Sequence, residues 1–369
     1  MSALEASSAR VPVLLGGCRC GRTSLLIDIQ RHVGEYRCQY IDLERAATTP
    51  ERFHRAVCLD SPFVAPDVSL AASSPRAAFD ATLAFLTGAR ATDGGPATFL
   101  MDEVLEFRTF ESFPGLRHVM HDLLSGISGS SNRFVLATRY ISRGLRWLRD
   151  AAPRLEVILI PPLDPSEIRD ALAAANWPGQ EIEETARTVH ALTEGHPGSA
   201  QTLLRAMGGS RRPDEADPVA ALAALLEPDG ALSQRLRWSY ELRLHRARGY
   251  GALKGILAIL AEEEPLTLTE IAHRLQRTPG STKDYLSWLE DVDLVRVARK
   301  RYAFADPLLR LWVRIHCRPS PPADDEIARE VRQYALARLP VPAEPAMAMA
   351  TVRAAAEDDR KTWGIIEID

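Results

Sequence analysis

The sequence predicts an α/β fold for the first half of the chain, with a parallel β-sheet covered by helices on both faces, and smaller helical modules after it. Two observations support this prediction. Short apolar runs recur at residues 11–15, 98–102, 133–138 and 155–160, each of the length of a buried strand. Segments with apolar residues at helical spacing separate them. Because alternating strands and helices build a parallel sheet, ligands are expected at the carboxyl ends of its strands.

The first strand leads into a glycine-rich turn and then a helix over residues 22–33. Gly16, four residues, Gly21, a basic residue and Thr23 have the spacing of a P-loop, in which backbone N–H groups and a helix start face a phosphate. This motif predicts ATP binding by the parallel sheet of a P-loop NTPase. The predicted nucleotide-binding residues in the loop are Gly16, Gly17, Cys18, Arg19, Cys20, Gly21, Arg22, Thr23 and Ser24. A strand-to-helix turn that merely contains glycines is the alternative interpretation.

Arg22 stands where a P-loop normally has a lysine that reaches the β- and γ-phosphates. An arginine keeps the positive charge but presents a wide planar fork in place of a compact ammonium. We therefore expect nucleotide binding to be favoured over fast hydrolysis, with Arg22 among the catalytic candidates.

A second signal comes from residues 98–103, TFLMDE, an apolar run that ends in two carboxylates. A buried central strand of this kind delivers an aspartate to Mg²⁺ and the next residue to a water molecule. We expect Thr23 and Asp102 to share the metal, and Glu103 to orient and polarise the attacking water. An ordinary solvated strand end is the alternative for the Asp-Glu pair.

Composition excludes several classes of protein. The 369 residues include 45 basic and 49 acidic ones, so a net charge of −4 provides no general attraction to nucleic acid or anionic membranes. Five cysteines without a framework spacing favour a reducing cytoplasm, and Cys18 and Cys20 are better explained as small buried side chains than as a metal pair. No signal peptide or transmembrane run is recognised. We expect a cytoplasmic protein without a membrane partner.

The remaining elements of the first half follow in order. A second strand is expected over residues 36–43, a helix from residue 49, a loop over 61–75 and a helix over 76–89. Another helix is expected around residues 116–124. The strand at 133–138 ends in the polar residue Thr138, and the fifth strand covers 155–160.

The last third of the chain has the pattern of a winged helix. A helix begins near residue 256, Thr267 and Glu270 form a capping box for the next, and Thr278 with a following proline starts a third. Two short strands, 294–297 and 301–304, flank a turn. Three helices and a two-stranded wing make this module.

Taken together, the P-loop, the Asp-Glu strand, the polar-tipped strand and the segments LIPPLDPSEIRDAL and TEGHPGSAQTLL resemble an AAA-type ATPase of the archaeal ATPase or STAND kind. The resemblance implies that Thr138 is a polar sensor of the γ-phosphate, with Arg139 beside it as a further candidate. It also implies self-assembly, in which an arginine before the fifth strand, here Arg154 or Arg149, reaches a neighbouring nucleotide. A solvated arginine is the alternative for both.

In this family a small helical lid follows the core, and its start here is the capped sequence at residues 164–167. Gly195-His196-Pro197 resembles the Gly-x-Pro motif of STAND lids, which implies that Pro197 contacts the nucleotide. A turn between two helices explains the same residues. Arg205 is the candidate second sensor of the lid.

The winged helix is a poor candidate reader of DNA bases, because its recognition helix carries Lys283 among several carboxylates. The wing has a basic cluster that could hold phosphates without reading sequence, so the candidate contacts to duplex DNA are Lys283, Arg299, Lys300 and Arg301. The alternative is a module that packs on the core as a latch or binds a protein.

The predicted organisation is a disordered N-terminus (1–10), a P-loop ATPase core (11–162), a helical lid (163–210), a helical linker region (211–248), a winged helix (249–318) and a proline-interrupted tail (319–369) suited to a protein partner. The predicted function is an ATP-driven conformational switch with slow hydrolysis. Two alternatives remain: a DNA-associated ATPase of a mobile element or defence system, and a nucleotide-binding scaffold without turnover.

Overall fold

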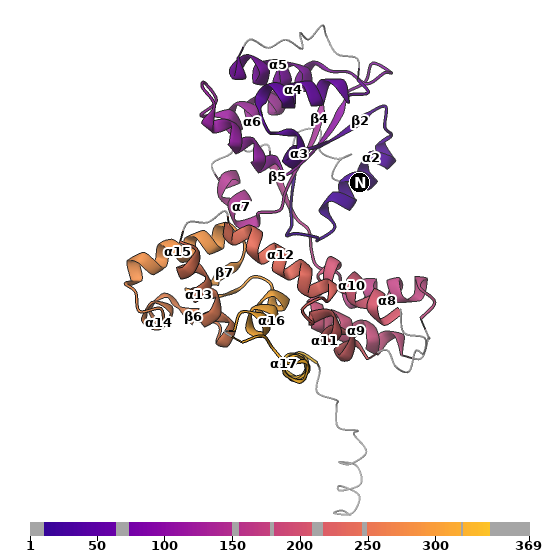
Figure 1. Ribbon diagram of the computed structural model, residues 1–369. Coiled ribbons are helices and arrows are strands. Elements are labelled where there is room, and N and C mark those ends of the chain that lie inside the picture. The colour runs from indigo at the N-terminus through magenta and orange to yellow at the C-terminus, as the bar shows by residue number, and fades with distance from the viewer. Residues whose placement is uncertain are drawn as a thin grey trace, which may run out of the picture.

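The structure, a computed structural model, describes residues 11–63, 74–149, 155–177, 181–208, 217–245, 249–318 and 320–339. Figure 1 shows an α/β core at the top and two helical modules below it, with helix α12 (Ala231–His245) between them. The predicted disordered N-terminus and the end of the predicted tail lie outside the described residues.

The core contains the predicted parallel sheet, with strand order β2-β3-β4-β1-β5. Its strands are β1 (Val11–Leu15), β2 (Cys38–Asp42), β3 (Thr98–Asp102), β4 (Arg133–Thr138) and β5 (Leu155–Leu159). Leu15 pairs with Thr138, and Asp42 pairs with Asp102. Because the strands are parallel and in this register, their polar carboxyl ends lie together at one edge of the sheet.

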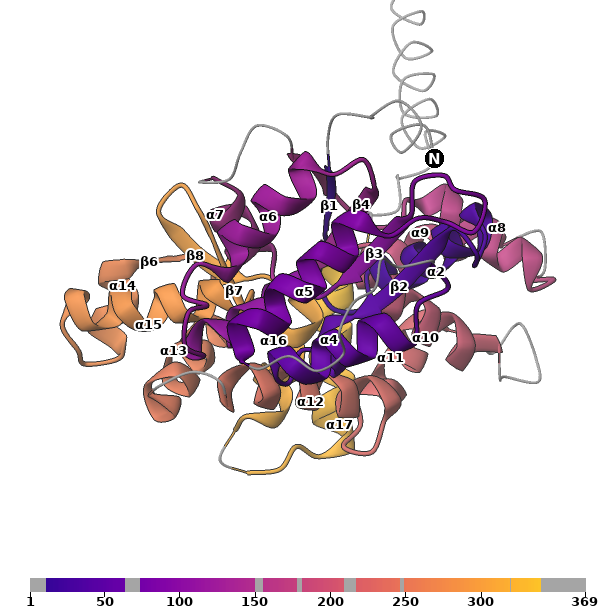
Figure 2. The same ribbon diagram turned by 90° about the horizontal axis from the view of Figure 1, so that it is seen from above.

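Alternate residues of each strand pack on opposite faces, as the period of two requires. One face packs against α2 (Arg22–Val33) through Leu26 and Ile29. The other is covered by α4 (Pro50–Leu59), α5 (Pro75–Gly88) and α6 (Val119–Gly129), where Phe53, Phe107 and Phe110 pack edge to face. Figure 2 shows α5 running across the strands on this side. The central strands are therefore buried on both faces, which explains their continuous apolar runs.

Three short elements of the core were not predicted: α3 (Leu43–Ala46), the 3₁₀ helix η1 (Val104–Ser112) and α7 (Ile141–Arg149). Each begins directly after a strand or strand tip. Asp42 caps α3 with its side chain, and Glu103 turns the chain into η1 through a left-handed backbone (φ 58°). The helix expected around residues 116–124 is α6, which begins at Val119.

A helical region follows the core. It comprises α8 (Pro165–Ala174), α9 (Ile182–Thr193), α10 (Pro197–Gly208), α11 (Pro218–Leu226) and α12. The predicted capping box at the start of α8 is confirmed, because Asp164 accepts the N–H of Glu167 and the Glu167 side chain accepts the N–H of Asp164.

The second module is a winged helix with α13 (Tyr250–Glu262), α14 (Leu268–Arg274) and α15 (Pro279–Asp291). The predicted two-stranded wing is confirmed, since β7 (Val295–Ala298) and β8 (Arg301–Phe304) pair antiparallel; β6 (Leu266–Thr267) adds a third strand that was not predicted. A two-residue strand has no period to detect in a sequence. Two further helices close the described chain, α16 (Pro307–His316) and α17 (Asp324–Leu336), the latter close to the helical spacing predicted for the tail. None of the helices in the described ranges combines the length and apolar character needed to cross a bilayer.

Candidate nucleotide-binding site

The loop between β1 and α2 has the backbone of a phosphate cradle. Gly21 has a left-handed conformation (φ 91°), which glycine adopts without steric cost, and directly precedes α2. Gly21 stands at the N-cap position and has no side chain that could cap the first N–H groups of this helix. These groups and the positive end of the helix dipole are available to an anion. All of the loop residues predicted from sequence, residues 16–24, lie here.

The Arg22 side chain turns inward and is only 8% exposed. Its Nε lies 3.0 Å from Asp102 Oδ1, its Nη1 donates to the Gly16 carbonyl oxygen at 2.8 Å, and its Nη2 contacts Glu103 Oε1. Each guanidinium nitrogen thus has its own acceptor, an arrangement that a single ammonium cannot reproduce. Phosphate oxygens entering the loop would compete with the two carboxylates for Arg22.

Asp102 sits at the end of β3 and accepts hydrogen bonds on both oxygens. Thr23 Oγ1 donates to Oδ2 at 2.7 Å, Tyr40 donates its hydroxyl to the same oxygen at 3.2 Å, and the Glu103 N–H donates to Oδ1 at 3.0 Å. Burial and the charges of Asp102 and Asp42 raise the pKa of Tyr40, so it remains a donor at neutral pH. The carboxylate is therefore fixed in orientation beside the P-loop hydroxyl.

This pair fits the Mg²⁺ that a P-loop ATPase fold implies. Thr23 donates its hydroxyl hydrogen bond to Asp102, so the lone pairs of its hydroxyl oxygen remain available to a hard cation. Thr23 and Asp102 are the residues that would hold the metal, whose chemistry is to neutralise charge on the phosphates. Their assignment as ligands remains a prediction.

Glu103, the predicted water-orienting residue, is held by two arginines. Besides Arg22, Arg139 contacts it with Nε at 3.0 Å, and the Arg139 backbone N–H donates to Oε2 at 3.2 Å. Burial raises the pKa of Glu103, with a smaller contribution from Asp102, against the opposing charges of both arginines. Both carboxylate oxygens already have partners, so Glu103 has to be released before it can polarise a water molecule.

The tip of β4 joins these groups to the P-loop. Thr138 is fully buried, its carbonyl oxygen accepts the Gly16 N–H at 3.4 Å, and its hydroxyl accepts the Tyr140 N–H at 3.4 Å. Arg139 bridges Glu103 and Glu44 of α3. Burial alone would lower the pKa of Arg139, but the two carboxylates outweigh it and raise the pKa. Because Arg139 at the end of β4 contacts Glu103, movement of Glu103 would displace Arg139.

The lid contacts the backbone of the P-loop. His196 Nε2 lies 2.9 Å from the Cys18 carbonyl oxygen, and the Gly198 N–H donates to the Arg19 carbonyl oxygen at 3.1 Å. Pro197, predicted to contact nucleotide, lies between these residues at the start of α10. The Gly-x-Pro segment thus lies against the phosphate loop, and its contact with a nucleotide remains a prediction.

The winged helix also reaches the core, through Asp293 just after α15. Its carboxylate accepts the N–H of Ile141 at 2.7 Å and of Ser142 at 3.0 Å, and thereby caps the start of α7. Arg243 of α12 donates to the Asp293 carbonyl oxygen at 2.9 Å and to Cys18 Sγ at 3.4 Å. One short path therefore links the P-loop, the β4 tip and the winged helix.

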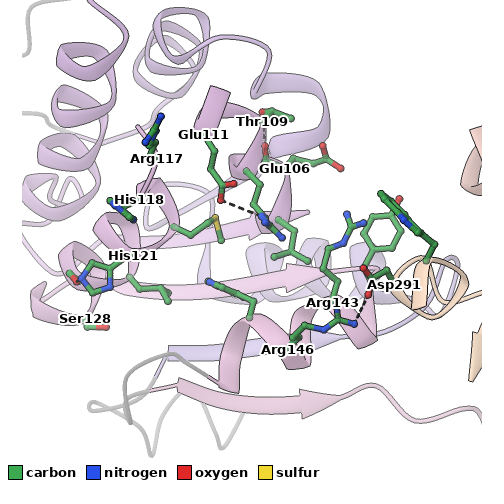
Figure 3. Close-up of a pocket in the computed structure, with 18 residues that line it drawn as sticks. Glu106, Thr109, Glu111, Arg117, His118, His121, Ser128, Arg143, Arg146 and Asp291 are labelled. Atoms are coloured by element: carbon green, nitrogen blue, oxygen red, sulfur yellow. Dashed lines mark hydrogen bonds and ion pairs between the residues drawn. The ribbon is translucent and has the colours of Figure 1, made fainter. Parts of the chain in front are cut away.

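Beside this contact lies an open groove of about 1220 Å³ between η1, α6, α7 and α15. Figure 3 shows Arg146 of α7 paired with Asp291 of α15 at one end of it, near Arg143. The groove contains none of the P-loop residues, so it is separate from the nucleotide site. It marks the seam along which the winged helix meets the core.

Several predicted residues lie elsewhere. Arg149 is exposed at the end of α7, and Arg154 lies outside the described residues. Lys283 and the wing residues are exposed on α15 and at the β7–β8 turn. Arg301 is partly engaged, since it donates to the Pro265 carbonyl oxygen at 3.1 Å.

Sequence reasoning did not identify Tyr40, Glu44, Arg243 or Asp293. Tyr40 and Glu44 flank the end of β2, so proximity to a strand end was an available signal for both. Arg243 and Asp293 lie more than 200 residues from the P-loop in sequence, and only the tertiary fold brings them to it.

Comparisons with known proteins agree with this architecture. No protein-family model matches the chain, and no curated protein sequence matches it. Among solved structures, a Walker-type ATPase of Pyrococcus abyssi aligns with a TM-score of 0.61 at 18% identity, over 85% of this chain and 93% of that one. Orc1 of Aeropyrum pernix, solved in complex with DNA, gives a TM-score of 0.45 at 17% identity over 92% and 91% of the two chains. RuvB of Thermotoga maritima, a Holliday junction branch migration motor, gives 0.41 at 14% identity over 82% and 88%. The first likeness shows that the chain has the fold of an AAA-type P-loop ATPase, as predicted.

Proposed function

We propose that this chain is an ATP-dependent conformational switch, in which ATP with Mg²⁺ binds the P-loop and weakens the docking of the winged helix on the core. The main support is the position of Asp293, which caps the helix that directly follows the β4 tip. A residue of the winged helix thus completes hydrogen bonds at the edge of the predicted nucleotide site. This is the latch alternative for the winged helix.

The first step of the switch is competition for Arg22. The triphosphate brings oxygens that pair with a guanidinium fork, as the Asp102 and Glu103 carboxylates do now. When Arg22 turns to phosphate, Glu103 loses one of its two arginines and can accept a proton from water. Slow hydrolysis follows, because the same arginine is drawn back to Glu103 in part of the molecules.

The second step passes through the β4 tip. Arg139 holds Glu103 through both its side chain and its backbone N–H, so release of Glu103 shifts the residues just before α7. The Asp293 cap depends on the position of the first two N–H groups of that helix. A displaced helix start would lose the cap, and the winged helix would come free.

The size of the cap suits a switch. A side-chain cap on a helix start is worth about 0.5–2 kcal/mol, and the half-exposed Arg146–Asp291 pair adds at most about 1 kcal/mol. Coupling energies between sites in proteins are typically about 1–3 kcal/mol. Nucleotide binding can therefore outweigh the Asp293 cap and the Arg146–Asp291 pair.

The test compares Asp293→Ala with wild type by hydrogen–deuterium exchange, with and without ATP and Mg²⁺. In wild type, ATP should raise exchange at residues 141–144 and along α15. The Asp293→Ala protein should show this raised exchange without nucleotide. Asp284→Ala is a matched control, since Asp284 is an exposed carboxylate on α15 and has no role in the cap.

Fluorescent ATP analogues, titrated in parallel, test nucleotide binding itself. The nucleotide assignment fails if neither protein binds them at micromolar concentration. The latch fails separately if ATP binds but exchange at α7 is the same in all states.

Two other functions keep a specific observation in their favour. Arg299 and Lys300 are exposed at the wing turn, which supports the DNA-associated ATPase with phosphate contacts from the wing. Occupation of both Glu103 oxygens supports a nucleotide-binding scaffold without turnover. The Asp291 pair with α7 argues against base reading, because it turns the end of the recognition helix toward the core.

A further inference from the structure

Three arginines from separate elements gather along one face of lid helix α10. Gly198, Thr202 and Arg205 lie on this face, because positions four and seven residues apart stack on a helix. Arg19 of the P-loop crosses at Gly198, where a side chain would place its Cβ 2.7 Å from that of Arg19. Arg235 of α12 contacts the Thr202 hydroxyl. The face between Gly198 and Arg205 is about 10 Å long at 1.5 Å per residue.

Within the described residues, none of these three guanidinium groups pairs with a carboxylate. Burial and the neighbouring charges of Arg19 and Arg205 lower the pKa of Arg235, which indicates that the positive charges repel one another. Most other arginines near the core have acidic partners, as Arg22, Arg139 and Arg146 do. Because no carboxylate of the described residues balances these charges, an external anion would stabilise the group.

The backbone of Arg19 gives a second, independent indication. Arg19 has a left-handed conformation (φ 63°), which disfavours any residue with a Cβ. Such backbone conformations are enriched at active sites and ligand-binding sites. The Arg19 side chain is exposed and lies toward α10, outside the cradle formed by Arg22. Its charge is therefore directed toward the α10 face.

A large aromatic side chain stands next to the group. Trp238 follows Arg235 by one helical turn on α12 and is 71% exposed. Proteins bind single-stranded nucleic acid with exposed aromatic rings, on which bases stack, next to cationic side chains, which hold the phosphates. Acidic peptides would use the cations but leave the indole without a matching partner.

We infer that Arg19, Arg205, Arg235 and Trp238 form a binding site for a single-stranded nucleic acid, which adjoins the P-loop through Arg19 and is separate from the wing. The arginines hold consecutive backbone phosphates along α10, and Trp238 stacks with a base. Contacts of this kind are independent of sequence and sensitive to salt. Because Arg19 belongs to the P-loop, bound strand would lie against the nucleotide site.

The test is fluorescence anisotropy of a labelled 20-nucleotide oligo-dT with the full chain, without nucleotide, over a range of salt concentrations. Arg205→Glu combined with Arg235→Glu should weaken binding at least tenfold. The slope of log affinity against log salt should fall by about 1.4, at about 0.7 for each lost single-strand phosphate contact. Trp238→Ala should weaken binding about tenfold and leave the affinity for ATP unchanged.

Arg237→Glu is the matched control. It makes the same charge change as Arg235→Glu alone, half that of the double variant, but Arg237 lines a different cavity between α12, α13 and α16. It should bind oligo-dT within about threefold of wild type, and thermal melts should confirm that all variants are folded.

Three results would overturn the inference. The site is excluded if the double variant binds oligo-dT with wild-type affinity. It is also excluded if Arg237→Glu loses as much oligo-dT affinity as the double variant, because such a loss indicates general charge attraction. Loss of ATP affinity with unchanged oligo-dT binding assigns the arginines to the P-loop nucleotide instead. The oligonucleotide titration contains no ATP, so its outcome is independent of whether the proposed switch is correct.

Discussion

Replacing Arg22 by lysine is expected to raise ATP turnover while changing ATP affinity little. Arginine spans Asp102, Glu103 and the Gly16 carbonyl with separate nitrogens, whereas the three donors of an ammonium radiate from one nitrogen and do not cover the width of the guanidinium fork. Catalysis is accelerated only by contacts that strengthen in the transition state, so an arginine that binds carboxylates in the ground state slows it. The lysine variant should free Glu103 in a larger fraction of molecules.

The structure sets the scale of this effect. The Arg22–Glu103 contact is a buried hydrogen bond between charged groups, a type worth about 1.5–3 kcal/mol. Loss of its lower value corresponds to about a tenfold change in the population of released Glu103, and so to about a tenfold faster turnover. Glu103 keeps Arg139, so the fold should survive the change.

Steady-state phosphate release at saturating ATP and Mg²⁺ measures the difference. The control adds Glu103→Gln to the lysine variant, which should abolish the gain. A lysine variant that is no faster than wild type, with equal ATP affinity, would refute the idea that the Arg22–Glu103 pair limits turnover. No turnover in either protein would mean that the pocket is a nucleotide-holding scaffold.

Three further predictions concern the carboxylates and the wing. Glu103→Gln should bind ATP as wild type does but should not hydrolyse it, and phosphate release at the wild-type rate would show that Glu103 does not orient the water. Asp102→Ala should instead weaken the Mg²⁺-dependent part of ATP binding. Replacing Arg299, Lys300 and Arg301 of the wing by glutamate should reduce the affinity for duplex DNA and flatten its salt dependence, as measured by anisotropy with labelled duplex. Unchanged or absent DNA binding would favour the latch. Because the pKa of Glu103 is raised in the folded chain, its protonation contributes to the free energy of unfolding. This contribution is complete below the ordinary pKa of 4.5 and is lost as the pH rises through the folded-state pKa. Denaturant unfolding at several pH values should therefore show wild type losing stability relative to Glu103→Gln above pH 4.5, and parallel curves would contradict the burial of an ionisable Glu103.

Local pattern was enough to predict the sheet, because its central strands β1, β3 and β4 are buried on both faces and therefore consist of apolar runs. The P-loop and the Asp-Glu pair were recognised for a related reason. Their chemistry depends on residues adjacent in sequence, at the end of one strand and the start of one helix. Gly16, Thr23 and Asp102 therefore appear where the spacing placed them.

The role of Arg22 was only half predictable. Its departure from lysine is visible in the sequence, and so is the planar fork of its side chain. That the fork spans Asp102 and Glu103 depends on β1 and β3 lying two strands apart in one parallel sheet, with β4 between them. The proposed competition between the carboxylates and phosphate depends on this arrangement of strands.

The sequence by itself determined the strands, the phosphate loop and the existence of a winged helix, since these depend on short-range periodicity and on turn and cap residues. Only the tertiary structure shows where the winged helix contacts the core. Asp293 reads as an ordinary acidic residue after a helix, and Arg243 as a solvated cation. They become a cap on α7 and a contact to Cys18 because folding brings together segments about 150 and 225 residues apart. No local pattern encodes such a pairing, because an aspartate or arginine that bonds a distant segment looks the same in the sequence as one exposed to solvent.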